Sequence, residues 1–151
     1  MFRRECFERI GGYLPIPEGG EDALACVMAR MAGFETRSYE SLRIEHLKSR
    51  NAAFGGLLKR EWQLGLRDHA MGVDPLFELA KCVVRIANKP WILGSLARAL
   101  AYMFYTIQGR RRVVPNEVVA FMRAEQRRRL KAVALSVVTR YAGGKAVQHA
   151  G

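Results

Sequence analysis

The chain has 151 residues, of which 50% are hydrophobic, and its 25 basic and 14 acidic side chains give a formal net charge of +11. This length and composition exclude a disordered chain and predict one globular domain with a hydrophobic core. The positive excess follows the first forty residues and favours phosphate-bearing partners, which include nucleic acid, anionic lipid and diphosphate substrates.

The three cysteines, Cys6, Cys26 and Cys82, are an odd number and show no CxxC spacing. The printed sequence does not open with an apolar secretory segment, so we expect reduced thiols and a cytoplasmic location. Cys26 and Cys82 fall within apolar helical patterns, where a cysteine is usually buried and inert. We expect no metal or thiol chemistry from them.

Near the N-terminus, the glycines and prolines of residues 11–20 predict a loop. Apolar residues then recur at helical spacing, and Gly33 provides a stop, so a helix is expected at about 21–32. Residues 34–46 favour extended structure, with a short strand ending at His46.

The remainder of the sequence predicts helices. Asp74-Pro75 has the arrangement of a helix cap followed by a first-turn proline, leading a helix over 76–87. The other expected helices lie at about 53–70, from Pro90, and at about 115–141. Residues 143–151 are expected to form a flexible tail.

Residues 91–108 are the most apolar stretch, but Arg98 interrupts them, and they offer fewer than about 20 clean apolar residues for a membrane span. Two readings stay open. The stretch is either a helix buried against other helices or a helix lying in the plane of a membrane, with Arg110-Arg111-Arg112 at its end.

Gly19-Gly20-Glu21-Asp22 is the first candidate for chemistry. Acidic residues in a first helical turn are ordinary capping, because the helix dipole stabilises their charge. Alternatively, Asp22 is a general base, and the glycines let a ligand approach the backbone. His46 is a candidate metal ligand, although a lone histidine is commonly structural or solvated.

Several motifs follow one another along the first part of the chain: Phe2–Tyr13, Gly19-Gly20-Glu21-Asp22, Ala29-Arg30-Met31, Gly33-Phe34 and His46. A helical extension that contains Asp74-Pro75-Leu76-Phe77 and Glu125-Gln126 comes after them. The order and spacing of these motifs resemble those of the family-two glycosyltransferases. The resemblance implies an A-type glycosyltransferase fold. The expected class is therefore α+β and mostly helical, with short strands near the N-terminus that include Met1–Glu5.

By this resemblance, Asp22 matches the general base of inverting transfer, Glu21 supports the acceptor side, and His46 matches a metal-coordinating position. The implied partners are a nucleotide-sugar donor, a hydroxyl acceptor that is lipid-linked or a surface polysaccharide, and a divalent cation, Mg²⁺ or Mn²⁺. Residues 1–50 would be an incomplete catalytic domain and residues 51–142 a helical extension. Nothing in the sequence corresponds to the family's nucleotide-binding half, so the chain is expected to be inactive alone. It would be a truncated reading frame, a fragmentary gene model, or one half of a split enzyme whose other half is a separate N-terminal chain.

Two further functions remain open on the sequence. Arg123 to Lys131 could meet nucleic-acid phosphates, although arginines on one helix face are usually a solvated surface. Residues 91–112 could lie on an anionic membrane, which would place a cytoplasmic protein at the inner face of the bilayer. The membrane reading is compatible with sugar transfer.

Overall fold

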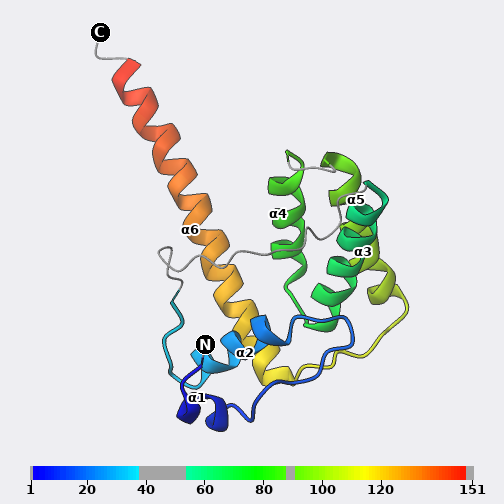
Figure 1. Ribbon diagram of the computed structural model, residues 1–151. Helices are drawn as coiled ribbons and strands as arrows, with labels where there is room; N and C mark the ends of the chain where they lie inside the picture. The colour runs from blue at the N-terminus through cyan, green and yellow to red at the C-terminus, as the bar shows by residue number, and fades with distance from the viewer. Residues whose placement is uncertain (1, 38–53, 88–90, 149–151) are drawn as a thin grey trace.

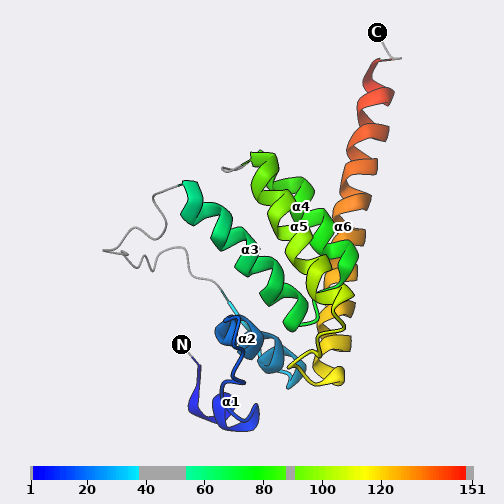
Figure 2. The same ribbon diagram turned by 90° about the vertical axis from the view of Figure 1, so that its right-hand side faces the viewer.

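The computed structural model describes residues 2–37, 54–87 and 91–148, and within these ranges all regular secondary structure is α-helical (Figure 1). The last helix is long, and its C-terminal part projects from the body in both ribbon views (Figures 1 and 2). The six helices are α1 (Arg4–Arg9), α2 (Glu21–Met31), α3 (Phe54–Ala70), α4 (Pro75–Arg85), α5 (Trp91–Ile107) and α6 (Asn116–Gln148).

The predicted α+β class with N-terminal strands is wrong for the described residues. Where a strand was expected at Met1–Glu5, helix α1 begins at Arg4. Cys6 and Ile10 are buried at the i, i+4 spacing of one helix face, and Arg4 pairs with Glu8 at 2.7 Å across the same spacing. A strand would need a partner for its backbone groups, and the described part of the chain offers none. The expected strand ending at His46 lies outside the described residues.

The helical predictions are confirmed more closely. α2 follows the expected range, and α4 begins at Pro75 with the Asp74 carboxylate accepting from the Leu76 amide at 2.9 Å. α3 and α5 also fall where they were expected. α6 begins next to Pro115 and continues to Gln148, beyond the expected end near residue 141.

A single hydrophobic core joins the N-terminal segment to the later helices. Leu24 of α2 is fully buried. Its cluster combines side chains from the 11–20 loop, α2, the end of α3, the α3–α4 connection, the segment before α6 and the first turns of α6: Ile16, Leu24, Val27, Ala70, Met71, Val73, Val114, Val118, Val119 and Met122. A bidentate pair between Arg30 and Glu125, at 2.9 and 2.8 Å, also ties α2 to α6.

Helices α3, α4 and α5 form a second packed unit on one side of the body (Figure 2). Gly65 lets α3 and α5 approach closely, because a Cβ atom there would lie 2.2 Å from the Arg98 carbonyl oxygen and 2.8 Å from the Ala101 Cβ. Only a residue without a side chain fits at this crossing.

Candidate functional site

The loop before α2 presents Asp22 to solvent. Gly19 and Gly20 have φ values of +83° and +103°, a left-handed backbone that favours glycine. Gly20 caps α2, and Glu21 and Asp22 occupy its first turn, where the unpaired amides and the helix dipole favour negative charge. Asp22 is exposed and Glu21 half-buried. A substrate hydroxyl could therefore reach the Asp22 carboxylate from outside.

Gly20 is also packed closely from behind. A Cβ atom at this position would lie 2.9 Å from Cδ of Arg67 and 3.1 Å from Sδ of Met71, both at the end of α3. The loop is thus held against α3, and the position of Asp22 depends on that contact.

Glu18 connects the same loop to α5. The Tyr105 hydroxyl donates to Glu18 Oε1 at 3.3 Å, while Glu18 Oε2 is buried and has no hydrogen-bond partner in the described part of the chain. His69, 4% exposed, lies edge-on to Tyr105 with ring centroids 5.8 Å apart. Burial lowers the pKa of His69; Arg112 and Arg123 add to this effect and Glu18 opposes it. Polar groups from five parts of the chain therefore act on one another behind the loop.

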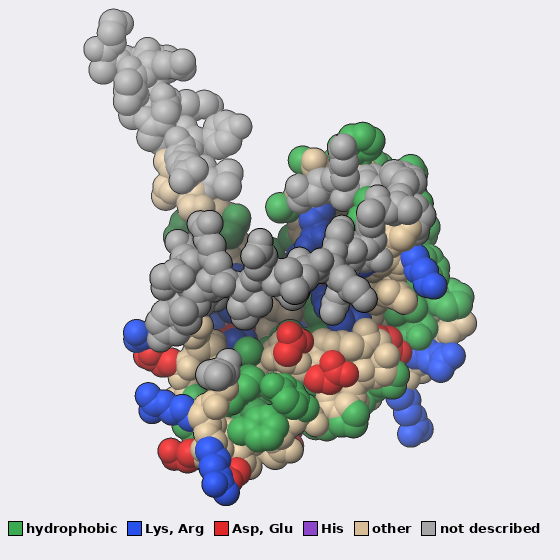
Figure 3. Space-filling model, in the orientation of Figure 1, with side chains coloured by type: hydrophobic (Ala, Val, Ile, Leu, Met, Phe, Trp, Pro, Cys, Tyr) green, Lys and Arg blue, Asp and Glu red, His purple; other side chains and the backbone are tan. Residues whose placement is uncertain are grey.

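Helices α4 and α5 expose an unusually large apolar surface. Figure 3 shows hydrophobic side chains over the part of the molecule that contains α3, α4 and α5. We call the exposed apolar side chains of these two helices, with the cap residue Ile86, the α4–α5 face. It consists of Leu76, Leu79, Val83 and Val84 from α4, Ile86 at the C-terminal cap of α4, and Trp91, Ile92, Leu93, Leu96, Leu100, Met103, Phe104 and Ile107 from α5. Many exposed apolar side chains on two packed helices are typical of an interaction site.

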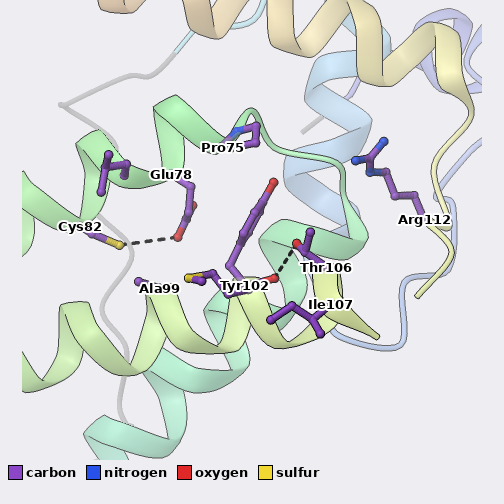
Figure 4. A pocket seen from close by; sticks show the side chains of 10 residues that line it. Pro75, Glu78, Cys82, Ala99, Tyr102, Thr106, Ile107 and Arg112 are labelled. Atoms are coloured by element: carbon purple, nitrogen blue, oxygen red, sulfur yellow. Dashed lines mark hydrogen bonds between the residues drawn. The ribbon is translucent and has the colours of Figure 1, made fainter. Parts of the chain in front are cut away.

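A pocket of about 360 Å³ opens between the two helices on this side (Figure 4). Its walls are largely apolar. They include Leu79 on α4, and Ala99, Met103 and Ile107 on α5, with Arg112 contributed by the segment after α5.

The side of α4 opposite its exposed apolar side chains is charged and buried. This arrangement is the reverse of an ordinary amphipathic helix, which buries its apolar side, so we call α4 inverted. Glu78 is 3% exposed and accepts from Arg98 Nε at 2.8 Å. Arg98 also pairs with Asp68 of α3, and Lys81 reaches both carboxylates at 2.5 Å. Burial acts to raise the pKa of Asp68, but Lys81 and Arg98 outweigh it and lower that pKa to about 2. This ionic cluster fixes α4 against α3 and α5 with its leucines outward.

A basic segment follows α5. Arg110, Arg111 and Arg112 are exposed, and the Arg110 guanidinium lies 5.5 Å from the Tyr105 ring centroid. No hydrogen bond or ion pair holds Arg112 among the described residues. The segment thus places positive charge at the end of the apolar surface.

Of the predicted site residues, the structure places Glu21 and Asp22 together, whereas His46 lies outside the described residues. Within the described ranges, no group of three His, Cys, Asp or Glu side chains could hold a metal ion. The divalent cation that the resemblance implies therefore stays a prediction. The sequence analysis did not predict the inverted α4 or the role of Arg98. Glu78 and Arg98 are charged residues within apolar stretches, and this pattern could have indicated a buried ion pair.

Over the described ranges, this is a helical protein with an acidic helix N-terminus and an apolar surface bordered by arginines. None of the described helices is long and apolar enough to cross a membrane. Comparisons with known protein families, with curated proteins and with solved structures found no match.

Proposed function

We propose that this chain provides the acceptor side of an inverting glycosyltransferase, with Asp22 as the general base. The observation that carries the proposal is an exposed carboxylate in the first turn of α2, directly after two glycines with positive φ. The motifs around it resemble the family-two glycosyltransferases. The nucleotide-sugar would be bound by a part of the enzyme outside these residues.

In this reaction the Asp22 carboxylate takes the proton of the acceptor hydroxyl. The hydroxyl oxygen then forms a bond to the anomeric carbon of the sugar as the bond from that carbon to the diphosphate oxygen breaks, and the nucleoside diphosphate leaves with the electron pair. Glu21, half-buried beside Asp22, would orient the acceptor. A divalent cation remains a prediction, and no step is derived through it, because the described residues offer no ligand set.

The proposal is tested by co-expressing the chain with a nucleotide-binding half and measuring transfer from UDP- and GDP-sugars to a bacterial lipid extract. We expect Asp22→Asn to lower the rate by about 10²–10⁴-fold, the usual contribution of a general base. Glu117→Gln is the matched control, since Glu117 is an exposed carboxylate in the first turn of α6. Transfer that survives Asp22→Asn unchanged would exclude Asp22 as the base.

The α4–α5 face supports a second function, peripheral attachment to an anionic membrane such as the inner face of the bacterial cytoplasmic membrane. Its aromatic and aliphatic side chains suit the boundary between head groups and acyl chains, and Arg110–Arg112 stand at one end of the surface. The net charge of +11 acts in the same direction. By contrast, Arg123 and Arg127, which were considered for nucleic acid, contact the Gly72 carbonyl and the Asp74 carboxylate.

Flotation with vesicles of phosphatidylcholine alone, or mixed with phosphatidylglycerol, tests the attachment. We expect binding to the anionic vesicles that weakens with salt and is lost in Leu96→Glu, since Leu96 is half exposed on α5. Val133→Glu adds the same charge at an exposed apolar position on α6 and should bind like wild type. Equal flotation of the two variants would contradict attachment through this face.

A further inference from the structure

The pocket between α4 and α5 is a partly open groove that runs along the two helices. The two helices run antiparallel, so Pro75 at the start of α4 lies at the same end as Ile107 at the finish of α5, while Cys82 and Ala99 lie toward the other end. Leu79 and Met103, which fall between these positions along α4 and α5, also line it. A groove with this lining favours a hydrocarbon chain over a polar ligand.

The two ends of the groove differ in charge. Among the described lining residues, the one carboxylate is that of Glu78, which lies between Pro75 and Cys82 and is paired with Arg98 and Lys81. At the end opposite Cys82, Arg112 contributes an exposed guanidinium that has no ion-pair partner among the described residues. An unpaired arginine beside an apolar groove is suited to an anionic head group, and phosphate matches its geometry.

We propose that this groove binds a long-chain phosphate monoester, with the hydrocarbon along α4 and α5 and the phosphate at Arg112. The volume of about 360 Å³ lies within the range of ligand pockets, roughly 300–1,000 Å³. The groove would contact the hydrocarbon chain, and Arg112 the phosphate head group. Inorganic phosphate and an uncharged long-chain alcohol each lack one of these contacts, so neither should bind as well as the phosphate monoester.

The phosphate end of the groove lies toward the loop that carries Asp22. Tyr105, on the last turn of α5, donates to Glu18 of that loop, and Arg112 and Glu18 both act on the pKa of His69. The inference rests on the proposed function in one respect: a long-chain phosphate bound here would bring its head group to the acceptor side of the transferase. Binding to the groove itself does not depend on catalysis.

Calorimetric titration of the full chain with dodecyl phosphate, kept below its micelle concentration, tests the site. We expect saturable binding, at least tenfold weaker binding of dodecanol, and no comparable binding of inorganic phosphate. Arg112→Gln should weaken dodecyl phosphate about tenfold, whereas Arg111→Gln, which removes the same charge next to the groove lining, should not. Equal binding by the two variants, or phosphate binding as tight as dodecyl phosphate, would overturn the proposal.

Blocking the groove provides a second measurement. Ala99→Phe places a ring in the lining and should abolish dodecyl phosphate binding, whereas Ala124→Phe on the exposed side of α6 should not. Circular dichroism of both variants checks that each still folds. In a background of Cys6→Ser and Cys26→Ser, dodecyl phosphate should also slow the reaction of the Cys82 thiol with a disulfide reagent. Unchanged binding in folded Ala99→Phe would contradict the groove.

Two further measurements distinguish this inference from the proposed functions and identify the source of the bound hydrocarbon chain. Dodecyl phosphate should bind Asp22→Asn as it binds wild type, so a failure of the catalytic proposal leaves the groove intact. Phosphatidic acid vesicles should displace dodecyl phosphate if the bilayer supplies the ligand; a lack of displacement, with groove binding retained, supports a free long-chain phosphate. If wild type floats with anionic vesicles yet never binds dodecyl phosphate, the groove proposal is overturned and membrane attachment stands.

Discussion

At the residue scale, Arg98 shows how one charge can organise three helices. Its guanidinium is 2% exposed and contacts Asp68 of α3 and Glu78 of α4, two carboxylates that are themselves almost fully buried. The attraction of the carboxylates outweighs the effect of burial and raises the pKa of Arg98, so it stays charged throughout the working range. The ion pairs are retained because each charge would be costly to bury alone.

We therefore expect Arg98→Met to lower the free energy of unfolding by about 3–5 kcal/mol, the usual effect of removing one partner from a buried ion pair. Urea denaturation followed by circular dichroism measures it. Arg85→Met is the control, because Arg85 is about half exposed and lies 3.5 Å from Glu61. An exposed ion pair of this kind contributes less than about 1 kcal/mol to stability. Similar losses in both variants would mean that Arg98 contributes no more than a surface charge.

His69 makes the stability depend on pH. Since its pKa is lowered in the folded chain, chiefly by burial, the unfolded chain takes up a proton at this residue first. Stability is full above the unfolded pKa of about 6.5 and falls as the pH decreases toward the lowered folded value. We expect the melting temperature of wild type to fall more steeply between about pH 7 and about pH 5.5 than that of His69→Phe, which keeps a ring beside Tyr102 and Tyr105. Parallel curves would exclude His69 as the source.

At the scale of the helices, local signals in the sequence predicted most elements. The apolar spacing over 21–32 and the Asp74-Pro75 cap each describe interactions within a few residues, and both are found in the structure. The N-terminal strand was inferred from the order of motifs, but the Cys6–Ile10 spacing and the Arg4–Glu8 pair are local helical interactions that override it.

The position of Glu21 and Asp22 at a helix start was predictable to a similar degree, whereas their catalytic roles stay predictions. The glycine-rich loop and the helix start place Glu21 and Asp22 correctly, because these too are local features. The inverted face of α4 was not predictable, since it depends on Arg98 reaching Glu78 across twenty residues of sequence. A charged residue within an apolar stretch indicates that it has a partner of opposite charge, but the sequence does not show which residue that partner is.

The crossing of α3 and α5 gives an element-scale prediction. Alanine is the better helix former by up to about 1 kcal/mol, yet a Cβ at residue 65 would lie 2.2 Å from the Arg98 carbonyl oxygen. We expect Gly65→Ala to be destabilising overall, because overpacking costs about 1–3 kcal/mol. Gln63→Ala, at an exposed position of α3, should change urea stability by less than about 0.5 kcal/mol. A more stable Gly65→Ala variant would show that the two helices separate without cost.

For the whole molecule, the structure joins the proposed catalytic loop and the proposed lipid surface through packing. The core that contains Leu24 extends from the 11–20 loop through the α3–α4 connection into α6. Tyr105 and Glu18 add a polar link from α5 to the loop. Residues 2–37 and the later helices should therefore unfold together.

Leu24→Ala tests this cooperativity. Leu24 is fully buried, so we expect a loss of about 2–5 kcal/mol in the free energy of unfolding. Because Trp62 and Trp91 lie in α3 and α5, tryptophan fluorescence should show the same shift in urea midpoint as far-ultraviolet circular dichroism. Leu79→Ala, the matched change at a side chain that is 59% exposed, should leave both midpoints nearly unchanged. A Leu24→Ala variant whose circular dichroism midpoint falls while its fluorescence midpoint stays fixed would show that residues 2–37 unfold separately from the unit that carries the α4–α5 face.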